Sequence, residues 1–296
     1  MPEATAQSLS GVPATMLITL YIRAMESQRP DALIKDERAE ALVRQLDQET
    51  LRKTLALTED TGRAVLILKG REFDRFTQDF LARHPDAVVV HIGCGLDTRF
   101  ERVDNGRVEW YDLDLPDVIE LRRKLIGGEG LAPSLRSELA LNEVKGQALS
   151  AVEGERHHFL AGSVLEDAWL EAVEAHHQHH FLFLAEGVFM YFTEAQVKSL
   201  VLRLKEHFPG AELVFDAYSP FMRWAHNLRV IRKRIGARLH WALKHSRDLE
   251  GWGAGIRLLD ERFPFQFPEV DLRRTLRVRL VPSLVARGIG VFRYQL

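Results

Sequence analysis

The chain has 296 residues, 46% of them hydrophobic, a formal net charge of −2 and a single cysteine. A chain of this length buries about three quarters of the surface that its unfolded form exposes, so it can build one large α/β domain with additions. The near-neutral charge disfavours nucleic acid or an anionic membrane as a partner, and one cysteine excludes an internal disulfide. Residues 1–22 lack a basic start and a long apolar run, so we expect no membrane partner and a cytoplasmic protein.

Helical periodicity dominates residues 14–83. Apolar residues recur at helical spacing in ATMLITLYIRAM, ERAEALVRQL and FDRFTQDFLA, as expected for helices with one buried face. Asp36 stands where it can cap the second of these helices, and Pro85 ends the helical part. We therefore expect residues 1–84 to form an N-terminal helical cap and residues 85–296 to form the main domain.

From residue 87 onward, short apolar strands alternate with amphipathic helices. The predicted strands are 87–92, 107–115, 157–162, 180–192 with its loop, and 212–218, and the helices between them are 116–126, 164–176 and 193–208. This alternation predicts right-handed crossovers and a mostly parallel sheet covered on both faces. Two further strands are expected in 276–296, and a surface helix with loops in 127–155.

The segment after the fifth strand is basic. Residues 221–247 read as a long helix, and the glycine-rich stretch 251–255 follows it. Because its charges are interleaved with apolar residues at helical spacing, we expect an amphipathic helix with a solvated face. We interpret 221–255 as a helical lid over an acceptor pocket, while RNA binding is the alternative for this segment.

A glycine turn follows the first strand. Gly93 and Gly95 lack a Cβ, so a ligand can lie directly on the backbone there, at the carboxyl edge where open parallel sheets bind their ligands. Asp112 and Asp114 end the next strand, and a carboxylate at that place can accept hydrogen bonds from both hydroxyls of a ribose. Together, turn and acid predict a cofactor that contains adenosine.

Two cofactor classes share this arrangement. A dinucleotide usually shows a third glycine in the turn, which lets helix and strand pack closely, but Thr98 holds that position here. Asp97 beside the turn also suits a pyrophosphate poorly. The sequence therefore favours S-adenosylmethionine and keeps an NAD-dependent oxidoreductase as the alternative.

Three blocks of the sequence resemble one family. HIGCGLDTRF (91–100), WYDLDLPDVIELRR (110–123) and FLAEGVFMYF (183–192), in this order, are similar to the leucine carboxyl methyltransferase family, and to its bacterial polyketide O-methyltransferase branch in particular. The resemblance implies a class I, Rossmann-like methyltransferase fold with a sheet of seven mostly parallel strands, the last one antiparallel. It also implies S-adenosyl-L-methionine as the cofactor.

The resemblance places a set of residues at the cofactor: Lys69, Arg71, Gly93, Cys94, Gly95, Asp112, Asp114, Ser163, Val164, Glu186 and Gly187. Asp114 is the expected ribose ligand and Asp112 the alternative. Lys69 stands where the family often has an Arg that reaches the cofactor's carboxylate, and Arg71 is the other candidate. Ser163 and Val164 replace an Asp-Leu pair that often lies near the adenine.

Transfer of a methyl group from a sulfonium needs alignment and exclusion of water more than acid–base chemistry. By position, Tyr191, Asp216 and Tyr218 are the candidate catalytic residues, and Arg23, Tyr191 and Tyr218 the candidate substrate-binding residues. The histidine run 176–180 lies at the opposite edge of the predicted sheet, so we expect no metal.

The sequence thus predicts an S-adenosylmethionine-dependent O-methyltransferase that modifies a carboxylate or hydroxyl of a small molecule, such as a polyketide-like metabolite. The alternatives are an NAD-dependent oxidoreductase and an RNA-directed methyltransferase or RNA-binding protein. Whether the chain forms a homodimer is left open.

Overall fold

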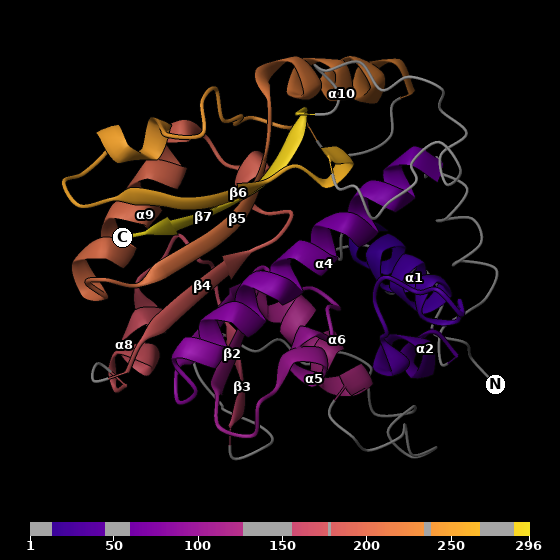
Figure 1. Cartoon of the computed structure of the whole chain (residues 1–296), viewed down its shortest axis with the longest axis horizontal. Coiled ribbons are helices and arrows are strands. Elements are labelled where there is room, and N and C mark those ends of the chain that lie inside the picture. Colours follow the sequence, from indigo (N-terminus) through magenta and orange to yellow (C-terminus); the bar gives the residue numbers. More distant parts are fainter. Residues whose placement is uncertain (1–13, 45–59, 127–155, 177–178, 234–237, 267–286) are drawn as a thin grey trace.

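The computed structural model describes residues 14–44, 60–126, 156–176, 179–233, 238–266 and 287–296. Within them, a seven-stranded sheet has the order β3-β2-β1-β4-β5-β7-β6 (Figure 1). Its strands are β1 Val88–Ile92, β2 Glu109–Asp114, β3 His157–Ala161, β4 Phe181–Ala185, β5 Glu212–Tyr218, β6 Arg257–Arg262 and β7 Ile289–Gln295. Strands β1 to β5 pair in parallel, while β7 runs antiparallel to β5 and β6. The predicted sheet, with its antiparallel last strand, is confirmed.

The strand order reverses beside β1. The chain goes from β1 outward to β2 and β3 and then returns to pair β4 with the other edge of β1. Such a reversal leaves the loops after β1 and β4 side by side at the carboxyl edge, where they cannot close over the sheet in the same direction. The sequence-predicted residues at the ends of β1, β2, β4 and β5 therefore share one rim.

Helices cover both faces of the sheet. They are α1 Ala14–Ser27, α2 Glu37–Val43, α4 Asp60–Arg83, α5 Arg99–Val103, α6 Pro116–Ile126, α8 Ala168–Glu174, α9 Glu194–His207 and α10 Pro220–Lys233, with short 3-10 turns η2 Phe189–Tyr191, η3 Asp248–Gly251 and η4 Pro264–Gln266. On one face, α4 packs Phe73 and Phe80 against Val89. On the other, Trp169 of α8 and Val197 of α9 pack against the alternate residues of β1.

The helical N-terminal part divides into two kinds of packing. Helix α4 belongs to the layer that covers the sheet, whereas α1 and α2 lie together beside it (Figure 1). The core between α1, α2 and α6 includes Cys94 and Leu96, which belong to the turn after β1. The predicted boundary at residue 84 separates α4 and β1, two elements that share a core, and it stays a prediction. The N-cap at Asp36 is confirmed, because its carboxylate accepts the Ala39 N–H at 2.8 Å.

The predicted helix over 221–247 is half right. Helix α10 spans Pro220–Lys233, but residues 238–247 are not helical. Burial alternates there, with Leu239, Trp241 and Leu243 buried between more exposed neighbours. That period belongs to an extended chain. The N–H groups of His240, Trp241 and Leu243 accordingly donate to carbonyls outside this stretch, those of Met190 and Tyr218.

Strand β6 was not predicted. It lies at the edge of the sheet, most of its residues are polar, and its pairing with β7 is irregular between Leu258 and Asp260. An edge strand of this kind carries no continuous apolar signal. The other expected terminal strand, within 276–286, and the predicted helix in 127–155 lie outside the described residues. No helix that the structure describes is long and apolar enough to cross a membrane.

Candidate cofactor and acceptor site

The glycine turn after β1 bends back onto the end of β2. Gly93 and Gly95 have φ angles of +65° and +51°, a conformation that L side chains rarely adopt. The Gly93 N–H donates to the Leu113 carbonyl at 2.7 Å, and the Gly95 N–H donates to Asp114 Oδ2 at 2.8 Å. The turn therefore presents backbone without side chains next to the acid at the end of β2.

Two side chains flank this turn. A Cβ on Gly93 would lie 2.4 Å from Val188 Cγ2, and a Cβ on Gly95 would lie 3.1 Å from Met16 Sδ. Val188 comes from the loop after β4 and Met16 from α1, so both elements approach the turn where glycine leaves room. Helix α1, far away in the sequence, is thereby part of the site.

Asp114 lies at the rim in a partly buried position. Its Oδ1 accepts the Leu115 N–H at 2.8 Å, and burial raises its pKa. Each carboxylate oxygen keeps a second lone pair for a further donor. The neighbouring strand end is tied to it, since the Gly162 N–H donates to the Asp114 carbonyl at 2.9 Å. Ser163, next in the chain, stays partly exposed, whereas Val164 is buried in the core.

Asp112, the alternative ribose ligand, does not lie at the rim. It is fully buried, and its carboxylate contacts Arg122, His157 and the Trp110 Nε1–H. Burial alone would raise its pKa, but Arg122, His157 and His91 together outweigh burial, so the pKa lies well below its usual range. Side chains alternate between the two faces of a strand, so Asp112 and Asp114, two residues apart, lie on the same face. They differ in position along the strand: Asp112 is buried within the sheet, and Asp114 is at its carboxyl end.

A buried lysine joins the ends of β4 and β5 to α4. Lys69 Nζ lies 2.9 Å from Asp216 Oδ2 and 3.7 Å from Glu186 Oε1. The Gly187 N–H donates to the other oxygen of Asp216 at 2.6 Å. Burial lowers the pKa of Lys69, but Asp216 and Glu186 together raise it above its ordinary value, so the ammonium stays charged.

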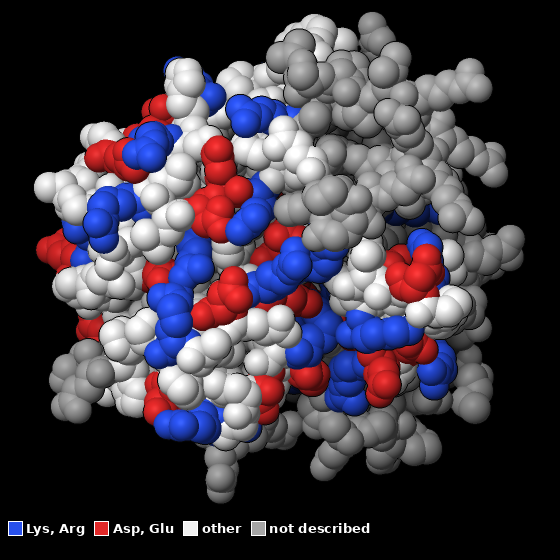
Figure 2. Space-filling view, viewed as in Figure 1, with Lys and Arg blue, Asp and Glu red and all other residues white. Residues whose placement is uncertain are grey.

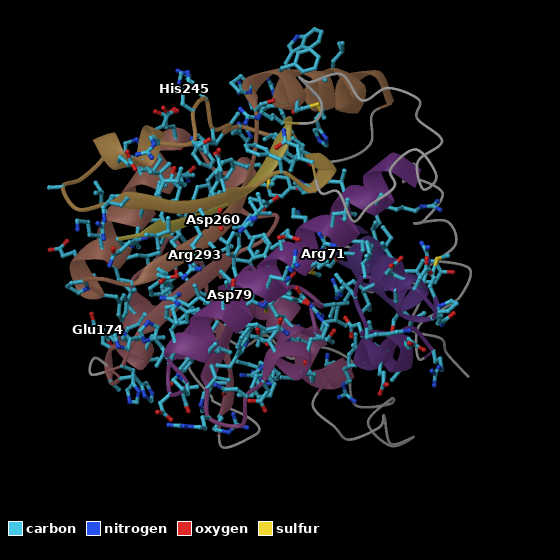
Figure 3. All side chains as sticks on the ribbon, viewed as in Figure 1. Arg71, Asp79, Glu174, His245, Asp260 and Arg293 are labelled. Atoms are coloured by element: carbon cyan, nitrogen blue, oxygen red, sulfur yellow. The ribbon has the colours of Figure 1, made fainter. Side chains whose placement is uncertain are left out.

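Arg71, on the same helix as Lys69, has a different partner. Its guanidinium contacts Glu72, the next residue, at 2.9 Å, and Figure 3 marks it on α4. Of the two cations that the sequence offered for the cofactor's carboxylate, Lys69 is the one that the structure brings to the rim beside Glu186.

A network of charges under the rim was missed by sequence reasoning. Arg99 contacts Asp97 at 3.0 Å, Asp74 at 2.7 Å and Glu186. Arg102 bridges Asp74 and Asp97 as well. The signal was present in the sequence, because an Asp-Thr-Arg triplet directly follows the glycine turn.

Arg23 belongs to this network as well. Its guanidinium donates to Asp36 at 3.0 Å and to the Leu96 carbonyl at 2.8 Å, and it lies 3.8 Å from Asp97. Burial would raise the pKa of Asp97, but Arg99, Arg23 and Arg102 hold it well below its ordinary value. These contacts connect α1 to the glycine turn. The substrate-binding role of Arg23 stays a prediction.

A narrow cavity lies between α1, α4 and the glycine turn. Its walls include Ile22, Ile67 and Gly70 on the helices and Asp97 and Glu186 at the rim. Thr19, Arg23 and Arg99 also line it, so the two acids face two cations with which they are paired, beside an apolar helical wall.

Tyr191 and Tyr218 lie at the β4 and β5 ends near Lys69. Burial is the main cause that raises the pKa of both, to about 12 for Tyr218. The stretch after α10 crosses this rim, because the N–H groups of Trp241 and Leu243 donate to the carbonyls of Met190 and Tyr218. It therefore lies across the ends of β4 and β5, and the predicted lid role of 221–255 stays a prediction.

Cys94 packs in a hydrophobic core, and two histidines of the run 176–180 make hydrogen bonds. Cys94 is buried, and burial raises the pKa of its thiol, which makes it a weak nucleophile. His176 contacts the Tyr111 hydroxyl, and His179 contacts the Asp86 carbonyl. No group of three potential metal ligands occurs among the residues that the structure describes. On the face in Figure 2, Lys and Arg are interspersed with Asp and Glu.

Comparison with known proteins identifies the family of this chain. The model of the leucine carboxyl methyltransferase family matches residues 16–205. The tetracenomycin polyketide synthesis O-methyltransferase TcmP of Streptomyces glaucescens is 32% identical over 255 residues, which cover 86% of this chain and 83% of that protein. The S-adenosyl-L-methionine-dependent methyltransferase dpfgK of Gibberella zeae is 27% identical over 270 residues, with the same coverage of both chains.

Solved structures support the fold. A DUF574 family protein from Streptomyces avermitilis superposes with a TM-score of 0.53 at 12% identity, covering 94% of this chain and 96% of that one. A crystal structure from Thermobifida fusca gives a TM-score of 0.56 at 13% identity, covering 97% of this chain and 96% of that one. At such identities the likeness concerns the fold alone.

Proposed function

Because the chain belongs to the leucine carboxyl methyltransferase family and is an S-adenosylmethionine-dependent methyltransferase, we propose that it methylates an oxygen atom of a small carboxylic acid. The cofactor supplies the methyl group and a good leaving group. The protein's task is to hold donor and acceptor in line and to exclude water.

The residues present fit this cofactor. The turn at Gly93 and Gly95 offers bare backbone, and the Asp114 oxygens have lone pairs left for the two ribose hydroxyls. Glu186 is an acid suited to the positive amino group of the methionine part, and Lys69 is a cation suited to its carboxylate. Met16 and Val188 flank the turn and would shield the bound donor from solvent.

The surroundings of Asp216 favour a carboxylate over a hydroxyl as the methyl acceptor. The Asp216 side chain is fully buried, and its two oxygens accept from Lys69 and from the Gly187 N–H. Unlike the partly exposed Asp114, Asp216 has no exposed surface and is paired with an ammonium, so it is poorly placed to take a proton from a substrate hydroxyl. This pairing is the observation that carries the choice of acceptor.

The two tyrosines point the same way. A raised pKa keeps Tyr191 and Tyr218 protonated at neutral pH, so both can donate a hydrogen bond and neither acts as a base. A phenol or alcohol would need a base within reach, whereas a carboxylate is already ionised near neutral pH. The predicted catalytic trio therefore favours a carboxylate, which needs only to be held and aligned.

Exposed aromatic side chains occur after β4 and on α10, the helix that follows β5. Tyr191, Phe221 and Trp224 are 39%, 44% and 60% exposed, and the rings of Phe221 and Trp224 are 6.1 Å apart on α10. Exposed aromatic rings of this kind suit a planar ring system. Together with the relative that acts in polyketide synthesis, they make polyketide-like aromatic acids the first acceptors to test.

The test uses the chemistry of the product. The purified protein is incubated with the donor carrying a labelled methyl group and with a panel of paired aromatic acids and phenols of the same ring system. A methyl ester releases labelled methanol in mild alkali, whereas a methyl ether does not. We expect alkali-labile label with the acids only; alkali-stable label from the phenols would contradict the carboxylate proposal while leaving methyl transfer itself intact.

A further inference from the structure

Arg122 of α6 is a fully buried guanidinium directly beneath the glycine turn. Its Nη1 donates to the Gly95 carbonyl at 3.0 Å, its Nη2 donates to Asp112, and its guanidinium carbon lies 5.5 Å from the centre of the Phe159 ring. A buried ion pair is a weak source of stability, because taking both charges out of water costs about as much as their attraction returns. Stability alone therefore does not explain why a buried Arg122–Asp112 pair lies under the glycine turn.

Asp112 is in turn held from three sides. The Trp110 Nε1–H donates to it at 2.9 Å, His157 Nε2 lies 2.7 Å from it, and His91 Nδ1 lies 3.3 Å from it. Asp112 is also part of β2, whose backbone is fixed by pairing with β1 and β3. The acid thus gives Arg122 a rigid support that does not move with the turn.

Gly95 is bonded on both of its backbone groups. Its carbonyl accepts from Arg122, and its N–H donates to Asp114. A glycine with a positive φ has no side chain to restrict it, so these two bonds decide where its peptide units lie. One of the two partners is the acid that we assign to the ribose.

We infer that Arg122, supported by Asp112, is a positioning residue that fixes the glycine turn against Asp114 and so sets the spacing in which the cofactor's ribose is held. The inference depends on the proposed ribose contact of Asp114. Arg122 itself touches no cofactor; it acts through the backbone of Gly95. The planar guanidinium reaches the carbonyl and the carboxylate at once, which a lysine cannot do with one ammonium in the same geometry.

The experiment is a double-mutant cycle read by calorimetric titration with S-adenosylhomocysteine. Arg122→Lys should keep the charge beside Asp112 and weaken binding about tenfold, as expected for loss of one hydrogen bond to a charged group. In an Asp114→Ala background, the same substitution should weaken binding by less than about twofold, because coupled residues are not additive. Equal effects in both backgrounds would mean a merely structural role and would overturn the inference.

The matched control is Arg293→Lys. Arg293 of β7, marked in Figure 3, makes a comparable pair of bonds to Glu212 at the start of β5, away from the turn. Thermal unfolding should show similar losses of stability for Arg122→Lys and Arg293→Lys, but only the former should change binding. Asp112→Asn serves as the second variant. It should also weaken binding when Asp114 is intact, and it should have little effect in the Asp114→Ala background.

These measurements distinguish failure of the proposed ribose contact from failure of the positioning role of Arg122. No binding to the unaltered protein, or no effect of Asp114→Ala, would remove the proposed ribose site and the inference with it. Normal weakening by Asp114→Ala with no effect of Arg122→Lys would overturn only the inference. If both Arg122→Lys and Asp112→Asn failed to fold, the pair would be a stability element and the positioning role would be wrong.

Discussion

Gly93 shows how a single residue links the loop after β4 to the cofactor turn. Its φ of +65° is strained for any L side chain, and the space in front of its Cα is taken by Val188. Two costs therefore meet at one position, a backbone cost and a steric cost. They can be separated, because Gly106 has a φ of +78° with nothing within 4 Å of a Cβ.

We predict that Gly93→Ala destabilises the protein clearly more than Gly106→Ala. Gly106→Ala should cost about 1 kcal/mol, the usual penalty for a left-handed residue with a side chain, while Gly93→Ala adds the clash with Val188. Urea unfolding measures both. Val188→Ala in the Gly93→Ala background should recover part of the difference, and equal costs for the two glycines would show that Val188 does not crowd the turn.

Lys69 and Arg71 allow a second test at the scale of one side chain. We predict that Lys69→Met weakens binding of S-adenosylhomocysteine about tenfold or more, because a buried charge-assisted contact to the ligand's carboxylate is lost. Arg71→Met, the matched control on the same helix, should change binding less than about twofold. Titration with methylthioadenosine, which has no carboxylate, should not distinguish Lys69→Met from the unaltered protein; a loss there would assign Lys69 to another part of the ligand.

At the scale of elements, two helix N-caps differ in how much they contribute to stability, because their surroundings differ. Asp36 begins α2 and also contacts Arg23, Arg102 and the Thr98 hydroxyl, all in the buried network. Thr193 begins α9 in a capping box with Gln196, at the exposed end of its helix. The same kind of helix start is therefore a local device in α9 and a junction of three helices in α2.

We predict that Asp36→Ala lowers the free energy of unfolding by about 3 kcal/mol, because it removes the buried carboxylate that Arg23, Arg102 and the Thr98 hydroxyl share. Thr193→Ala should lower it by about 1 kcal/mol, the typical value of an N-cap. Equilibrium unfolding in urea compares the two. Similar losses would indicate that the remaining carboxylates, Asp97 and Asp74, are enough to neutralise Arg23 and Arg102.

The segment after α10 shows where periodicity can mislead. The basic run in 221–247 has apolar residues that fit helical spacing over its first half, and α10 is there. Its second half alternates with a period of two, and the structure shows an extended chain that bonds across the ends of β4 and β5. A change of period inside one polar run is easily read as one helix, although the alternation was present in the sequence.

At the scale of the whole molecule, buried tyrosines set the response to alkaline pH. Burial raises the pKa of Tyr111 and Tyr218 from 10.0 to about 12. In the unfolded chain both hydroxyls ionise near pH 10.0, while in the folded protein they keep their protons until about pH 12. The folded state therefore binds more protons across this window, and its stability must fall as the pH rises through it.

We predict that the free energy of unfolding declines steadily above pH 10, and that Tyr218→Phe makes the decline shallower because one titrating group is removed. Urea unfolding at a series of alkaline pH values measures the slope, and tyrosinate absorbance of the folded protein follows the ionisation itself. Ordinary tyrosine titration in the folded state would show that the buried hydroxyls are not protected.

Local pattern was enough to predict strands β1 to β5, most of the helices and the glycine turn. Strands β1 to β5 read as apolar runs bounded by turns, and the two glycines followed by an acid at the next strand end identify the kind of ligand. These features depend on neighbours in the chain, so periodicity and spacing carry them.

The tertiary structure alone decided which charged and polar groups face the site. Asp112 and Asp114 are two residues apart, yet the first supports Arg122 from within and the second stands at the rim. Likewise Lys69 reaches Asp216, 147 positions away, while Arg71 contacts Glu72 beside it. Depth and partners of this kind arise from contacts between distant segments, and no local pattern encodes the electrostatic balance that those contacts create.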